Sequence, residues 1–258
     1  MDQKQRREYL LRYLLDERAD SRDTDIPNDE MQQRRLLRGL MNVRMPGKVA
    51  PEFLRIQDEY LRDELARKKV QDVNELRFSS DGLALWQGDI TLLRADAIVN
   101  AANSRMLGCF IPNHSCIDNA IQTYAGIQMR YDCDRFMRAQ GYEEPTGRAK
   151  ITRGYNLPAK YVLHTVGPII NGALTQADEE LLAGCYRSCL QLAGETGLEN
   201  VAFCCISTGV FHFPKRRAAE IAVDTVREEL QKKTGVRRVI FNVFGDDDWR
   251  IYEDILGL

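Results

Sequence analysis

The sequence predicts an α/β protein in which helices cover both faces of a largely parallel or mixed sheet. From about residue 76 onward, short apolar runs alternate with longer helical stretches, and this alternation is typical of that class. The runs that read as strands cover residues 83–86, 97–99, 149–152, 161–164, 201–206 and 238–243. The stretches that read as helices lie around 117–140, 177–196, 215–233 and 247–256.

The segment before residue 76 has helical periodicity with no strand pattern between its apolar groups. Pro51 is a typical first-turn residue and opens the last of three helical stretches. The apolar residues at helical spacing include Tyr9, Leu10, Tyr13, Leu14, Met31, Leu37, Leu40, Met41, Phe53, Leu54, Tyr60, Leu61 and Leu65. We therefore expect residues 1–75 to form a helical extension packed on a main domain at 76–258. A separate partner-binding module is the alternative.

Bulk composition limits the partners. The net charge is −2, so no basic field attracts nucleic acid or anionic lipid, and we expect neither as a partner. No apolar run reaches the length of about 18 residues that a membrane span needs. The basic N-terminus is not followed by the apolar region of a secretory signal. Together with seven cysteines, an odd number, these features predict a cytoplasmic protein with reduced thiols.

Two segments that follow predicted strands carry side chains suited to a nucleotide. Asp89, in Gly88–Thr91, can accept a hydrogen bond from an exocyclic amine, although the same pattern is typical of a turn or helix cap. Asn100 and Asn103 leave the next strand and can present amides to sugar hydroxyls. An Asx-turn is the alternative for these asparagines.

A third segment combines metal-ligand residue types. Cys109, His114 and Cys116 lie within eight residues of one another, and two thiolates with one imidazole suit zinc. Structural zinc usually has four protein ligands, whereas three leave a position for water or substrate, as in catalytic sites. The spacing matches no common zinc finger, so three unconnected loop residues remain the alternative.

A fourth segment, Ser207–Phe211, links a buried strand to a helix through small residues. Backbone N–H groups in such a turn, with a helix start behind them, form an anion site. A plain strand-to-helix loop is the alternative. No P-loop pattern is present, so this is not the signal of an NTPase.

Taken in order, Gly88–Thr91, Val99–Asn103, Gly154–Pro168 and Ser207–Phe211 resemble the signature of the macrodomain family. The resemblance covers about residues 76–258 and implies a three-layer α/β/α fold with a mixed central sheet. Macrodomain hydrolases usually carry a run of glycines after the asparagine pair. Here the Cys109–Cys116 loop replaces that run, which resembles the zinc-containing branch with a helical N-terminal extension.

The resemblance assigns contacts to the adenosine and diphosphate parts of ADP-ribose. It implies that Asp89 bonds the adenine amine and that Ile90 contacts the adenine edge. Phe244, after the last strand, becomes a candidate to stack on adenine. Backbone N–H groups are expected to hold the diphosphate along Ser207, Thr208, Gly209, Val210 and Phe211.

At the distal ribose the resemblance implies Asn100, Asn103 and Asp118, with Asn103 and Asp118 as the catalytic candidates. Asp118 matches the aspartate that contacts this ribose or its attacking water in related hydrolases. The resemblance also favours one zinc ion per chain, bound by Cys109, His114 and Cys116.

The implied activity is zinc-dependent removal of mono-ADP-ribose from a modified protein side chain, by hydrolysis of a glycosidic or ester bond at the distal ribose. ADP-ribose and mono-ADP-ribosylated protein are the expected partners. A non-enzymatic ADP-ribose reader and an O-acetyl-ADP-ribose deacetylase are the alternatives. His164 is expected in the core, and His212 stands where similar sequences lead us to expect glycine.

Overall fold

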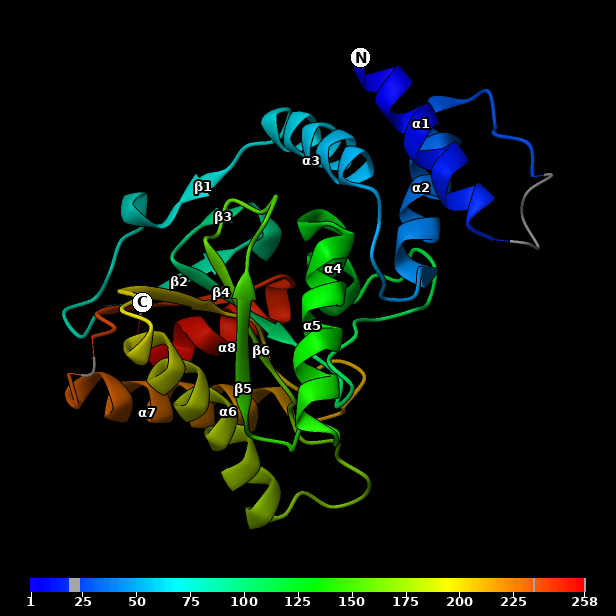
Figure 1. Ribbon diagram of the computed structural model, residues 1–258. Coiled ribbons are helices and arrows are strands. Elements are labelled where there is room, and N and C mark those ends of the chain that lie inside the picture. The colour runs from blue at the N-terminus through cyan, green and yellow to red at the C-terminus, as the bar shows by residue number, and fades with distance from the viewer. Residues whose placement is uncertain (19–23, 234, 258) are drawn as a thin grey trace.

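The computed structural model describes residues 1–18, 24–233 and 235–257, and its centre is a six-stranded sheet (Figure 1). The strand order is β2-β8-β7-β4-β6-β5, and β5 alone runs antiparallel to its neighbour, so the sheet is mixed as predicted. The strands are β2 (Leu83–Gln87), β4 (Ala97–Ala101), β5 (Ala149–Arg153), β6 (Tyr161–Thr165), β7 (Asn200–Phe203) and β8 (Arg238–Val243).

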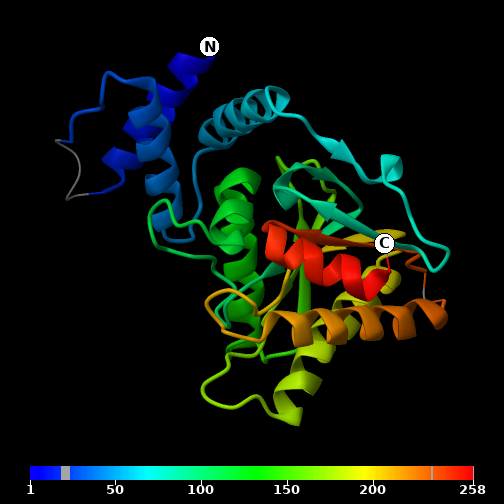
Figure 2. The same ribbon diagram turned by 180° about the vertical axis from the view of Figure 1, so that it is seen from behind.

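Helices cover both faces of this sheet, which confirms the three-layer α/β/α fold. One face carries α4 (Ile117–Ala125) and α5 (Ile127–Gln140). The other carries α6 (Gln176–Glu195), α7 (Lys215–Gln231) and α8 (Asp246–Leu256), with α7 and α8 side by side in Figure 2. No helix in the described part of the chain is long and apolar enough to cross a membrane.

A smaller element joins the N-terminal segment to the main sheet. β1 (Gln71–Asp72) pairs in parallel with β3 (Leu93–Arg94). Two short 3₁₀ helices flank this pair, η1 (Val73–Glu75) and η2 (Ile90–Leu92). The chain after the extension therefore lies beside the segment that follows β2.

The prediction of one helix around 117–140 is wrong, because the chain breaks at Gly126 into α4 and α5. Gly126 has φ 103°, which L side chains rarely adopt, and a Cβ there would lie 2.6 Å from Gln57 Nε2. Gln57 Oε1 accepts the N–H of Ile127 at 3.0 Å and so caps the start of α5. The break depends on a side chain from a distant helix, which a local pattern does not reveal.

The strand expected over 201–206 is also too long, since β7 ends at Phe203. Beyond it, Cys204 and Ile206 are buried but form no ladder with a neighbouring strand. Continuous burial produced the apolar run, and an apolar run by itself does not distinguish a strand from a buried loop.

Three helices form the N-terminal extension, α1 (Gln3–Asp16), α2 (Glu30–Val43) and α3 (Pro51–Ala66). In Figure 1, α2 lies beside α4, and α1 packs on α2 and α3 farther from the sheet. Their apolar faces make a separate cluster, which Ile127 of α5 joins from the main domain. The cluster contains Leu10, Leu11, Leu14, Leu15, Leu37, Leu40, Met41, Phe53, Ile56, Tyr60 and Leu61.

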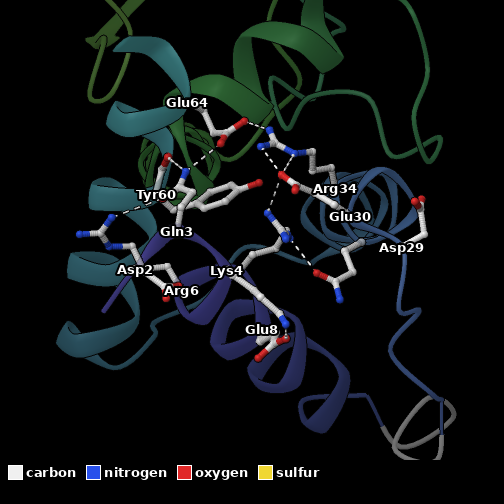
Figure 3. A network of polar contacts seen from close by, with 12 residues as sticks. Asp2, Gln3, Lys4, Arg6, Glu8, Asp29, Glu30, Arg34, Tyr60 and Glu64 are labelled. Carbon is white, nitrogen blue, oxygen red and sulfur yellow. Dashed lines mark hydrogen bonds and ion pairs between the residues drawn. The ribbon is translucent and has the colours of Figure 1, made fainter. Parts of the chain in front are cut away.

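A polar network fixes how these helices sit against one another (Figure 3). Arg34 of α2 forms ion pairs with Glu30, at 2.7 Å, and with Glu64 of α3. Gln3 of α1 donates from Nε2 to Glu64 at 2.8 Å and to the Tyr60 carbonyl at 2.9 Å. Ion pairs that stay in contact with water contribute little free energy individually, so the apolar cluster supplies most of the stability and the network sets orientation.

We expect Phe53→Ala to destabilise the protein by about 3–5 kcal/mol, because it removes a buried ring and leaves a cavity. Phe53 is 0% exposed and its ring centroid lies 4.5 Å from that of Tyr13. Met31→Ala is the control, since Met31 is 77% exposed on α2. Urea denaturation followed by circular dichroism measures both variants. Equal stabilities for the two would contradict the described packing of the extension.

Candidate active site

The four strands that carry the predicted motifs leave the sheet at one edge, because they run parallel. Asp89 follows β2, Phe244 follows β8, Ser207–Phe211 follows β7, and Asn103 follows β4. The order of these strands in the sheet is β2-β8-β7-β4. The candidate adenine, phosphate and sugar contacts therefore line up along the edge in the order in which those groups occur in ADP-ribose.

At the first end of this line, Asp89 caps η2. Its Oδ1 accepts from Thr91 N at 3.0 Å and from Thr91 Oγ1 at 2.6 Å. Its Oδ2 has no partner among the described residues, so one oxygen remains to accept from a ligand. Phe244 is 79% exposed nearby, and its carbonyl accepts from Gln87 at 3.3 Å. Ile90 is only 3% exposed, which leaves little of its surface for an adenine contact.

The segment Ser207–Phe211 forms a turn whose backbone donors are unused. None of the described residues accepts from the N–H groups of residues 208–211, although Phe213 N donates back to the Ser207 carbonyl at 3.0 Å. Gly167 permits this turn to pack closely, since a Cβ there would lie 2.0 Å from Ser207 Oγ. Free N–H groups just before α7 are suited to an anion.

His212 lies at the end of this turn and is exposed. Its φ is 58°, a conformation that glycine adopts without steric cost, and its N–H donates to the Gly209 carbonyl at 3.0 Å. This accounts for glycine being expected at the position, and the structure gives the imidazole no further role.

Two asparagines and one aspartate meet at the end of β4. Asn100 Nδ2 donates to Asp118 Oδ1 at 2.8 Å, and Asn103 Nδ2 donates to Asp118 Oδ2 at 3.3 Å. Asn100 is 0% exposed and faces α4, whereas Asn103 is only half-buried. Of the two amides, that of Asn103 is therefore the one open to a ligand, while Asn100 holds the carboxylate from inside.

Burial dominates the electrostatics of this group. It raises the pKa of Asp118 to about 6, against the opposing effects of the Asn100 hydrogen bond and the Arg130 charge. Burial also lowers the pKa of His164 to about 4, so that imidazole is neutral. Because Asn100 Nδ2 donates at 3.1 Å, His164 Nδ1 accepts, and Nε2 donates to Thr152 Oγ1 at 2.8 Å. His164 lies in the core as predicted, and it also orients Asn100.

The loop before α4 brings Cys109, His114 and Cys116 together. Their ligand atoms all lie within 4.8 Å of one another, and Cys109 Sγ lies 3.6 Å from His114 Nδ1. Ligands of a tetrahedral zinc ion are about 3.5–3.8 Å apart, given the usual Zn–S and Zn–N distances. No fourth His, Cys, Asp or Glu belongs to the group among the described residues. The donor set therefore fits a metal ion with one position open, and the Cys109–His114 distance is that of two ligands of one zinc ion.

Cys116 is also the N-cap of α4. Its Sγ accepts from Asn119 N at 3.4 Å. Burial raises its pKa to about 11, and the charges of Cys109 and Asp118 add to this effect. A divalent cation between the thiols would offset the repulsion and favour the thiolates.

Comparison with known proteins relates this architecture to a family. The family model described as Macro domain matches residues 99–222. A Treponema medium protein named protein-ADP-ribose hydrolase is 51% identical over 261 residues, which span 100% of both chains. A Staphylococcus aureus (strain MSSA476) protein with the same name is 51% identical over 97% of this chain and 95% of its own. The chain belongs to the family of macrodomain protein-ADP-ribose hydrolases.

Solved macrodomains share the fold. A Trypanosoma brucei macrodomain in complex with ADP-ribose matches with a TM-score of 0.68 and 32% identity, over 90% of this chain and 97% of that one. An Oceanobacillus iheyensis macrodomain with ADP matches with a TM-score of 0.63 and 36% identity, over 70% of this chain and 94% of that one. The second structure is matched over almost its whole length by 70% of this chain, so the macrodomain fold does not require the whole of this chain.

The macrodomain site also contains a residue that no motif singled out. Arg130 of α5 is 4% exposed, and its guanidinium lies 4.4 Å from the centre of the Phe110 ring, in the candidate metal-ligand loop (residues 109–116). Burial lowers its pKa to about 10, while the Asp118 charge opposes the shift. One signal in the sequence could have indicated that Arg130 is buried. It lies three residues from both Ile127 and Cys133, so it shares the apolar face of α5.

We expect Asp89→Ala to weaken ADP-ribose binding by about 1–3 kcal/mol, because the adenine amine loses its acceptor. Thr91→Val is the control, since it removes the hydroxyl that Asp89 binds but keeps the carboxylate. Its affinity should stay close to native. Titration calorimetry measures both variants. Native affinity in Asp89→Ala would mean that the residue serves only as a cap of η2.

Proposed function

We propose that this macrodomain removes mono-ADP-ribose from a modified protein side chain, with one zinc ion bound by Cys109, His114 and Cys116. One observation carries the proposal: the half-buried amide of Asn103, the carboxylate of Asp118 and a group of three metal-ligand residues converge at the end of β4. The neighbouring strand supplies the turn with free N–H groups.

Family membership supports the substrate class. The Treponema medium and Staphylococcus aureus relatives are named protein-ADP-ribose hydrolase, and the Trypanosoma brucei macrodomain was solved with ADP-ribose. We propose that the protein acts in the cytoplasm, which agrees with the free state of all seven cysteines among the described residues. Its net charge of −2 supports the absence of a nucleic-acid partner.

The residues along the sheet edge would bind the ligand away from the reacting bond. Asp89 and Phe244 would take the adenine end, and the turn at Ser207–Phe211 would take the diphosphate through its N–H groups. Binding energy gained there would position the distal ribose beside Asn103 and Asp118. The anomeric bond of that ribose is the one to be hydrolysed.

Hydrolysis of this bond passes through a sugar with oxocarbenium-like positive charge. The Asp118 carboxylate would stabilise that charge or orient the attacking water, and Asn103 would orient a ribose hydroxyl. Asn100 keeps the carboxylate aimed by its 2.8 Å bond. A zinc ion held by the three ligand residues would supply Lewis-acid polarisation and a bound water of lowered pKa.

The position of the ligand group favours a catalytic over a structural metal. Structural zinc is normally closed by four protein ligands, whereas here three are grouped. Asp118 lies two residues after Cys116, and the amide of Asn103 bonds both Asp118 and the Gly108 carbonyl, at 3.3 and 3.0 Å. The sugar-binding candidates and the metal-ligand loop are therefore directly connected.

We expect Cys116→Ser to lose zinc while α4 remains intact, because serine caps a helix well but is a poor zinc ligand. Native protein should contain one zinc ion per chain by elemental analysis. Cys205→Ser, which alters a half-buried thiol outside the group, is the control and should keep the metal. Full zinc occupancy in Cys116→Ser would rule out this ligand assignment.

We expect metal-free protein and Asp118→Ala to release ADP-ribose from mono-ADP-ribosylated protein far more slowly than native enzyme. A loss of about 10²–10⁴-fold in kcat for Asp118→Ala is typical of a group acting in the transition state, with a smaller change in ADP-ribose affinity. Restored zinc should return the activity, and circular dichroism checks folding.

The same assay separates the competing functions. Full turnover by folded, verified metal-free protein would make the zinc structural and leave catalysis to Asn103 and Asp118. Tight ADP-ribose binding without release from any modified protein would favour a reader. Preferential cleavage of O-acetyl-ADP-ribose would favour a deacetylase.

A further inference from the structure

The N-terminal extension touches the metal-ligand loop directly, through α2. A Cβ added to Gly39 would lie 3.1 Å from Asn113 Nδ2 and 3.7 Å from Pro112 Cβ. Figure 1 shows the end of α2 beside the loop that precedes α4. The close approach at Gly39 allows its helical neighbours to reach the loop backbone.

Arg38 makes the central contact. Its Nη2 donates to the His114 carbonyl at 3.0 Å and to Asn119 Oδ1 at 2.9 Å. A guanidinium can only donate, so it fixes which end of the Asn119 amide faces it. The Asn119 Nδ2 group must then face the loop, where it donates to the Ile111 carbonyl at 3.0 Å.

Asn119 transmits this contact to the cysteines. It is 0% exposed, and its Nδ2 also lies 3.5 Å from the Cys109 carbonyl. Its backbone N–H donates to Cys116 Sγ at 3.4 Å. Through its two hydrogen bonds, Arg38 therefore acts on the backbone of His114 and, by way of Asn119, on both cysteines.

Asn42, one helical turn after Arg38, holds the same loop at a second point. Its Oδ1 accepts from the backbone N–H of Asn113 at 2.9 Å. Asn113 precedes His114 and has φ 57°. Asn42 Nδ2 donates to Thr123 Oγ1 at 2.7 Å, and that hydroxyl donates to the Asn119 carbonyl at 2.7 Å. Asn42 is 1% exposed, so these bonds do not compete with water.

The helix that carries these side chains is itself anchored to the main domain. The guanidinium of Arg130 satisfies carbonyls at the end of α2, where a helix leaves them without internal partners. Its Nη1 donates at 2.7–3.2 Å to the carbonyls of Met41, Asn42 and Arg44. Arg130 of α5 therefore holds the end of α2 in place, and the side chains of α2 in turn hold the loop.

We propose that Arg38 and Asn42 are positioning residues that set the geometry of Cys109, His114 and Cys116 for the metal. This inference rests on the proposed zinc site. The inference gives the extension a role in the chemistry. Helix α2 packs against the metal-ligand loop and would act on the reaction through the ligand residues. Groups that orient metal ligands in this way typically change metal affinity about 10–100-fold when they are removed.

The test compares two arginines on the same helix. Arg38→Met keeps the length of the side chain but loses both hydrogen bonds to the loop. Arg34→Met, one turn earlier, loses ion pairs to Glu30 and Glu64 that stay inside the extension (Figure 3). Zinc affinity is measured by competition with a chromophoric chelator, and thiolate coordination by the absorption bands of the Co²⁺-substituted protein.

We expect Arg38→Met to bind zinc about 10–100-fold more weakly than native protein, with altered Co²⁺ bands, while Arg34→Met stays near native. Asn42→Leu should weaken zinc binding in the same direction. Arg38→Lys keeps the charge without the planar fork and should recover only part of the affinity. Because it is the milder change, it keeps the test decisive if Arg38→Met does not fold.

Two different results overturn this inference. If native protein binds zinc through its cysteines but the Arg38 and Asn42 variants match Arg34→Met in affinity and Co²⁺ spectrum, the positioning role is wrong and the zinc site stands. If native protein binds no zinc, the proposed function fails as well and the inference fails with it.

Discussion

A carboxylate that is 6% exposed needs hydrogen bonds in place of water, and the site depends on how Asp118 meets that need. Asn100 and Asn103 at the end of β4 donate to its two oxygens. Asp118 lies in the first turn of α4, where the helix dipole also favours negative charge. These bonds fix the start of α4 against the end of β4. The loop between them, which carries the candidate ligands Cys109, His114 and Cys116, is then held at both ends.

Directional polar contacts join the extension to the main domain, beside an apolar contact at Ile127. Ile127 is the main-domain residue that joins the buried cluster of the extension. Beside it, Gln57 accepts the Ile127 N–H, and Asp58 accepts from Gln128 at 2.9 Å and from Asn156 at 2.7 Å. Hydrogen bonds have defined directions, whereas apolar contacts tolerate sliding. These contacts fix α3 on the main domain, as the Arg130 hydrogen bonds to the end of α2 fix that helix beside the loop before α4.

The protein has no basic field with which to attract a diphosphate, since its net charge is −2. The turn at Ser207–Phe211 offers unused N–H groups ahead of α7, and their geometry suits an anion without such a field. Local donors of this kind are selective for an anion of the right shape and position, whereas a net positive charge attracts anions in general. The turn follows β7, which pairs with β4, so the candidate diphosphate and sugar contacts lie at one edge of the sheet.

The sequence by itself determined the alternation of strands and helices, the motifs at the strand ends, and the eight-residue span that contains Cys109, His114 and Cys116. These features are local, and periodicity or residue chemistry within a short window is enough to detect them. The site residues inferred from those motifs stay predictions, although the structure brings Asn103, Asp118 and the three ligand candidates together. Only tertiary structure decided the break at Gly126, the inward orientation of Asn100 and the contact of Arg38 with His114. Each of these depends on a partner from another element, up to 76 residues away for Arg38 and His114. Packing of elements that are distant in the sequence fixes such pairs, and no local pattern carries that information.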